Sequence, residues 1–81
     1  MTPEKRAEIM EYAAELSTHI EKSCGIYPEN TEVRLIEDAG TWYVGAVIPN
    51  RNHSIEPFLM VGSRAEADEA KKVVESVFGI L

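Results

Sequence analysis

The chain has 81 residues and a mass of 9.0 kDa, which allows one small domain and excludes a second core. Fourteen acidic and eight basic residues give a formal net charge of −6, which disfavours binding to the phosphate backbone of nucleic acids. No apolar run reaches the roughly 18 residues that a membrane span requires, and the first residues lack the apolar stretch of a secretory signal. Because Cys24 is the one cysteine, these features predict a cytoplasmic protein without a disulfide framework.

The first predicted element is a helix over residues 2–24. Apolar residues recur at spacings of three and four and share one face: Ile9, Ala13, Leu16 and Ile20. Acidic residues repeat on the opposite face: Glu4, Glu8, Glu11 and Glu15. Two patterns with the same period indicate an amphipathic helix. Thr2 as N-cap, Pro3 at the first helical position and Gly25 in a left-handed C-cap predict its ends.

Two strands follow a turn that contains Pro28 and a backbone-bonding Asn30. Alternating apolar and charged residues predict the first strand over residues 32–37. A short loop over residues 38–40, with a glycine at a position of positive φ, predicts a hairpin. The second strand, over residues 41–48, is rich in aromatic and β-branched residues.

A polar connection, residues 50–54, leads to a third strand over about residues 56–61. Ser63 and Glu66 form the capping-box pattern that starts a second helix. Its predicted apolar face comprises Ala67, Ala70, Val74, Val77, Phe78 and Leu81. Gly79 is expected only to loosen the final turn.

The order helix, three strands, helix predicts an α+β fold. Short connections make the sheet an antiparallel meander, because parallel strands would need long crossovers. Two amphipathic helices need a common surface, so we expect a two-layer sandwich with both helices on one face of the sheet. The whole chain, residues 1–81, is expected to be one domain.

The second face of the sheet is expected to be partly apolar. If Trp42 points toward the helices, Tyr43 and Val47 point outward, although alternation alone does not decide between the two orientations. Every residue from 58 to 61 is apolar, so two of them face outward in either case. This pattern indicates a contact surface for a partner, or else the ordinary apolar exposure of a small domain. The residues expected to form the surface are Ile36, Tyr43, Val47 and Met60.

Two other surfaces are candidates for partner binding. The acidic residues of the first helix either bind a basic groove, in the manner of a phosphate backbone, or form a solvated helix face. They are Glu4, Glu8, Glu11 and Glu15. The connection over residues 50–54 includes Arg51 and His53, and it either inserts into a partner's groove or is a solvated turn.

No constellation of residues predicts catalysis, a cofactor or a metal site. His19 and Cys24 lie five residues apart on different sides of the helix, and His53 is the one further soft ligand. Cys24 follows a helix C-terminus, where the dipole disfavours a thiolate. Gly62 before the second helix is typical of ordinary capping rather than of a phosphate-binding loop. We therefore expect a protein that is not an enzyme.

The order of elements resembles that of double-stranded RNA-binding domains over the whole chain. Residues 62–72, with the sequence GSRAEADEAKK, are loosely similar to the small-residue-rich second helix of that family. The resemblance implies an α-β-β-β-α fold in which the start of this helix contacts phosphates. Here the family's lysine positions are acidic, at Glu66, Asp68 and Glu69, so we expect no affinity for nucleic acid. Small antitoxins that pair with basic toxin nucleases share the topology.

These observations predict a small acidic, non-catalytic protein-binding module without a cofactor or a membrane contact. We expect a homodimer or a complex with a protein partner, formed through the sheet face or an edge strand. An inhibitor or accessory protein, such as a phage-encoded antagonist of a host nucleic-acid-handling complex, would suit this size and acidity. The alternatives are a nucleic-acid-binding module of double-stranded RNA-binding topology and an antitoxin of a basic nuclease.

Overall fold

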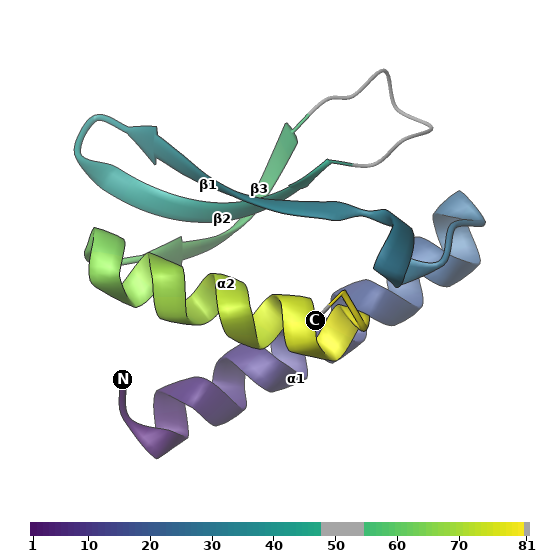
Figure 1. The fold of residues 1–81 in the computed structure, drawn as a ribbon, viewed down its shortest axis with the longest axis horizontal. Helices are drawn as coiled ribbons and strands as arrows, with labels where there is room; N and C mark the ends of the chain where they lie inside the picture. The colour runs from purple at the N-terminus through teal and green to yellow at the C-terminus, as the bar shows by residue number, and fades with distance from the viewer. Residues whose placement is uncertain (48–54, 81) are drawn as a thin grey trace.

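The structure, a computed structural model, describes residues 1–47 and 55–80, without the side chains of residues 55 and 56. Two helices lie side by side on one face of a three-stranded antiparallel sheet, and they contact each other and the sheet (Figure 1). The predicted α+β sandwich is therefore confirmed. The expected polar connection with Arg51 and His53, the strand end at Ile48, and Leu81 lie outside the described residues.

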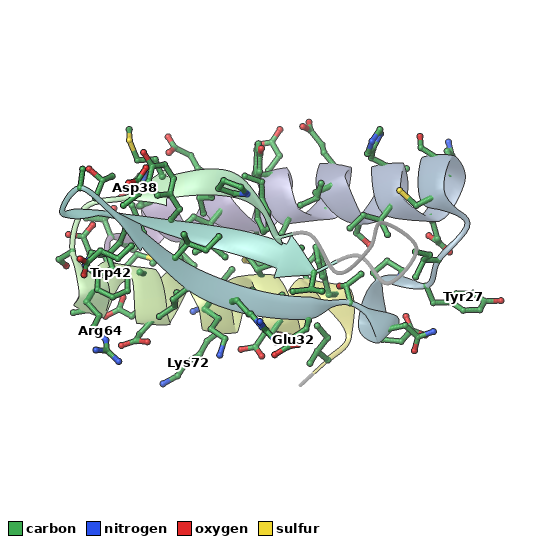
Figure 2. All side chains as sticks on the ribbon, turned by 90° about the horizontal axis from the view of Figure 1, so that it is seen from above. Tyr27, Glu32, Asp38, Trp42, Arg64 and Lys72 are labelled. Carbon is green, nitrogen blue, oxygen red and sulfur yellow. The ribbon has the colours of Figure 1, made fainter. Side chains whose placement is uncertain are left out.

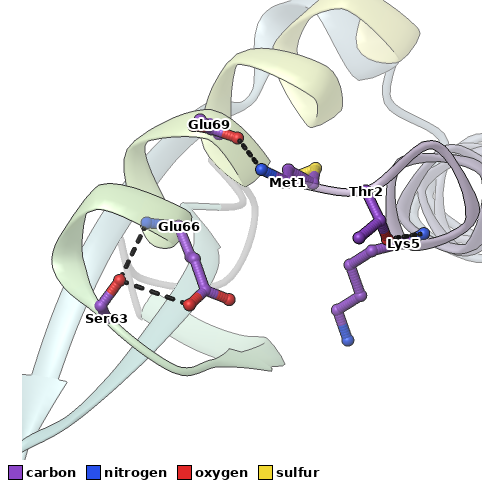
Figure 3. Close-up of polar contacts among 6 residues, drawn as sticks. All are labelled: Met1, Thr2, Lys5, Ser63, Glu66 and Glu69. Atoms are coloured by element: carbon purple, nitrogen blue, oxygen red, sulfur yellow. Dashed lines mark hydrogen bonds and ion pairs between the residues drawn. The ribbon is translucent and has the colours of Figure 1, made fainter.

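Helix α1 spans Pro3–His19 and continues into a single π-helical turn, η1, over Ile20–Cys24. The hydroxyl of Thr2 accepts a hydrogen bond from the Lys5 amide at 3.2 Å, as the predicted N-cap should (Figure 3). Gly25 ends the element with a φ of +67°, as predicted. The extent and both caps of the first helix are thus confirmed, whereas the change to π-helical hydrogen bonding has no signal in the sequence.

A 3₁₀ turn, η2 (Pro28–Asn30), connects the first helix to the sheet. The buried Thr31 fixes this turn, because its hydroxyl donates a hydrogen bond of 2.7 Å to the Pro28 carbonyl. The Thr31 amide donates to the same carbonyl at 3.0 Å. Thr31 therefore has the backbone-bonding role that was expected of Asn30.

The sheet consists of β1 (Glu32–Asp38), β2 (Thr41–Val47) and β3 (Ile55–Val61), in the spatial order β1-β2-β3. A two-residue turn joins the first two strands, with φ values of +53° at Ala39 and +79° at Gly40. These are the values of a type I′ turn, whose twist suits a hairpin. The positive φ at Gly40 was predicted, but the one at Ala39 was not, because alanine rarely adopts it.

Helix α2 spans Arg64–Phe78. The Ser63 hydroxyl accepts a hydrogen bond from the Glu66 amide at 3.2 Å, which confirms the first half of the predicted capping box (Figure 3). The second half differs from the prediction. In the predicted box the Glu66 carboxylate accepts a hydrogen bond from the Ser63 amide, whereas here it lies 3.5 Å from the Ser63 hydroxyl. The buried residues of the helix are Ala67, Ala70, Val73, Val74 and Phe78.

The second helix ends at Gly79, so the expectation that Gly79 only loosens a longer helix is wrong. Its φ is +80°, and its amide donates a hydrogen bond to the Ser76 carbonyl at 3.2 Å. The Ile80 amide donates to the Glu75 carbonyl at 2.9 Å, which completes a Schellman motif. A glycine is favoured here because its left-handed backbone carries no Cβ clash.

The hydrophobic core lies between the helices and the sheet. Its buried members on the first helix and its π-helical turn are Ile9, Ala13 and Ile20, and those on the strands are Val33, Val44 and Val61. Trp42, Leu35 and Leu59 are partly buried and pack against them. The orientation in which Trp42 and Val44 face the helices is therefore the one that the structure adopts.

A bulge in β3 adds Phe58 to the core side of the sheet. The pairing of β2 with β3 shifts between Val44 and Gly45, so Phe58 has no direct partner on β2. Its ring stacks on Tyr12 of α1, with 5.9 Å between the ring centroids. Through the bulge, an edge strand therefore contacts the first helix.

Within the described residues, neither helix is long and apolar enough to cross a membrane.

Candidate functional site

The face of the sheet that the helices leave open carries a continuous row of large apolar side chains. Ile36, Tyr43 and Met60 lie directly opposite one another across the three strands. Cross-strand partners share a face, and Trp42 and Val44 pack on the core side, so the three residues point away from the helices. Met60 is 65% exposed, and the other two are half-buried. We call Ile36, Tyr43 and Met60 the apolar row.

Val47 does not belong to the exposed part of this face. Its register places it on the same side as Tyr43, but it is only 8% exposed. The expectation that Val47 contributes to an exposed contact surface is therefore wrong. Val47 lies on the central strand, where it pairs with Glu32 of β1 and Ile55 of β3. Alternation correctly predicted that Val47 faces away from the helices, but it carries no information about how much of the side chain is exposed.

Few charges lie near the apolar row. Figure 2 looks onto this face, and the described charged groups on it all belong to β1. Glu32 and Arg34 form a bidentate ion pair, with Nη2–Oε2 and Nε–Oε1 distances of 2.9 Å each. The hydrogen bond from Arg34 lowers the pKa of Glu32, and the same bond raises the pKa of Arg34. With exposed Asp38, the described face carries a net charge of −1, against −6 for the chain.

The acidic residues of α1 form a separate surface. All four carboxylate side chains of this acidic stripe are exposed: Glu4, Glu8, Glu11 and Glu15. Lys5 Nζ lies 4.0 Å from the Glu8 carboxylate. The stripe belongs to the helical layer and the apolar row to the opposite face of the sheet (Figure 1), so the structure does not bring these two predicted surfaces together.

The residue types that support catalysis or metal binding are dispersed. His19 is exposed, and its Nδ1 lies 3.3 Å from the Ser23 hydroxyl. Cys24 is half-buried at the end of the π-helical turn. Within residues 1–47 and 55–80, no three histidine, cysteine or carboxylate side chains gather at one point.

The structure has the order helix, three strands, helix that was expected from the sequence, with both helices on one face of the sheet. At the start of α2, the exposed side chains Glu66, Asp68 and Glu69 are acidic. Comparisons of the chain with protein-family models, with curated proteins and with solved structures find no match. The function is therefore inferred from the residues and their geometry.

Proposed function

We propose that this domain is a non-catalytic protein-binding module that associates with a second copy of itself through the open face of its sheet. The observation that carries the proposal is the apolar row, which crosses all three strands on the face without helices. Contiguous exposed apolar groups of this kind mark contact surfaces in small domains. Association would remove the exposed Met60 side chain from water.

The apolar row is suited to a two-fold symmetric contact. A two-fold axis that lies in the plane between the two faces, parallel to the strands and over Tyr43, reverses the row, so that Ile36 of one copy lies over Met60 of the other. The same patch then serves both copies, as in the isologous interfaces of most homodimers. β1 of one copy would lie over β3 of the other, so the ion pair of Glu32 and Arg34 would not meet itself across the interface.

The distribution of charge favours this face for a contact between two copies. Two molecules of charge −6 repel each other over most of their surfaces. The open face carries a net charge of −1 among its described residues, and the acidic stripe lies in the opposite layer. Face-to-face packing therefore keeps the acidic stripes of the two copies apart and in water.

Sedimentation equilibrium over a wide concentration range tests the proposal. We expect a reversible monomer–dimer equilibrium, which Met60→Glu weakens at least about tenfold, because an unpaired charge would be desolvated in the contact. Met10→Glu is the matched control, since Met10 is 44% exposed on α1 and gains the same charge outside the sheet. Circular dichroism establishes that both variants are folded. A wild-type monomer at all concentrations, or an equal loss in both variants, would contradict the proposal.

The acidic stripe supports a second candidate, the binding of a basic protein in the manner of an inhibitor. Its four carboxylates are exposed on one helix. Replacing all four glutamates by glutamine would abolish such binding to a basic nuclease without weakening self-association. An unchanged affinity for that nuclease would remove this candidate.

A further inference from the structure

A groove of about 410 Å³ lies between α1 and α2, away from the apolar row. Its size is in the range of small-molecule sites. The lining residues are Met1, Arg6, Glu69, Lys72, Val73 and Ser76. None of them belongs to the surfaces that the sequence predicts to bind a partner.

Arg6 occupies a position on the packing face of α1. It precedes Ile9 by three residues and Ala13 by seven, so it continues the stripe that is buried against the rest of the protein. Ile9 and Ala13 are 1% and 0% exposed. The apolar stripe therefore ends in a guanidinium group at the point where the two helices leave a groove.

The opposite wall of the groove comes from α2. Lys72 and Ser76 are one turn apart and share a side of the helix, while Val73 is 5% exposed and forms an apolar floor. Glu69 supplies the one carboxylate of the lining, and it lies 3.3 Å from the amino group of Met1 (Figure 3). Among the described residues, no carboxylate lies within 4.0 Å of the charged groups of Arg6 or Lys72.

We propose that this groove binds the phosphate group of a small molecule. Arg6 and Lys72 would hold the phosphate oxygens from opposite walls, and the Ser76 hydroxyl would donate a further hydrogen bond. Two cationic side chains without a described carboxylate partner line this groove in a chain whose net charge is −6. A compact dianion satisfies both cations.

A titration with inorganic phosphate at constant ionic strength, followed by ¹⁵N NMR, tests the site. We expect saturable shifts of the amides around Arg6 and around Lys72–Ser76, with a Kd of about 1 mM or lower. Sodium chloride in place of phosphate should leave these amides unchanged. A parallel titration with glycerol 3-phosphate distinguishes the source of the phosphate, since tighter binding identifies a phosphate monoester and equal binding identifies the free ion.

Matched variants separate a site from general attraction of anions. Arg6→Gln and Lys72→Gln should each weaken binding about tenfold, whereas Lys5→Gln and Lys71→Gln remove the same charge from neighbouring positions outside the lining and should change it little. Glu69→Gln removes the carboxylate of the groove and should strengthen binding. Absence of saturable shifts, or equal weakening by all four variants that remove a positive charge, would overturn the proposal. Circular dichroism of each variant verifies the fold.

Discussion

Tyr43 and Met60 lie directly opposite each other on the open face of the sheet, one on the central strand and one on an edge strand. The pair places a half-buried aromatic ring beside a methionine that is 65% exposed. Methionine is flexible and polarisable, which suits a side chain that has to adapt to a contact. Substitutions at Met60 should therefore affect association much more than folding.

Val47→Glu should destabilise the fold and Met60→Glu should not, although both residues belong to the open face. Val47 is 8% exposed, so a carboxylate there would be buried without a partner and should lower the free energy of unfolding by several kcal/mol. Met60→Glu should melt within a few degrees of the wild type. Thermal melts followed by circular dichroism measure both, and a stable, folded Val47→Glu protein would show that Val47 is accessible.

Ala39→Asn should stabilise the domain by about 0.5–1 kcal/mol. Ala39 has a φ of +53°, which strains an alanine and which asparagine tolerates better. Ala39→Val is the matched control and should destabilise the domain, since β-branched residues tolerate positive φ least. Urea unfolding of the three proteins gives the order, and an Asn variant less stable than the wild type would contradict the assigned turn.

Trp42→Ala should cost about 3 kcal/mol of stability. The Trp42 ring packs against the core, and the Arg64 guanidinium lies 5.5 Å from its centroid (Figure 2). Arg64→Ala removes only the cation–π contact and should cost about 0.5–1 kcal/mol. Chemical denaturation separates the two contributions. Equal losses in both variants would mean that the ring contributes little beyond its contact with Arg64.

Arg34→Gln should raise the pKa of Glu32 toward its usual value near 4.5, because the hydrogen bond from Arg34 is what lowers it. A carboxyl group whose pKa is lowered in the folded state contributes stability that is complete above its unfolded pKa. That contribution is lost as the pH falls through the folded pKa. The variant should therefore lose less stability on acidification than the wild type. An NMR titration of the Glu32 carboxyl carbon measures the shift, and an unchanged pKa would show that the ion pair does not persist in solution.

The sequence predicted most of the fold because its local signals agree with one another. The positions of the helices could be predicted without tertiary information. They follow from the spacing of Ile9, Ala13 and Ile20 and from the caps at Thr2 and Ser63. Alternation along the strands left two choices for the set of side chains that faces the helices. The packing of Val44 in the core shows which of the two is adopted. The elements and their layers were therefore predictable from local pattern.

The candidate sites were less predictable, because they depend on how far each side chain is buried in the folded protein and on tertiary contacts. Val47 is buried although its register faces it away from the helices, and the groove at Arg6 exists only because two helices pack against each other. Gly79 ends a helix whose apolar pattern would allow it to continue, because backbone hydrogen bonds at its end compete with the pattern. A one-dimensional pattern contains none of these interactions.

The most direct test of the open face as the association surface is a search for intermolecular NOEs in a sample that mixes ¹³C-labelled and unlabelled protein. The two-fold contact predicts NOEs from the Met60 methyl group of one copy to Ile36 and Tyr43 of the other, at concentrations where sedimentation shows the dimer. Intermolecular NOEs that map to α1 or α2, with none at Met60, would contradict the proposed function.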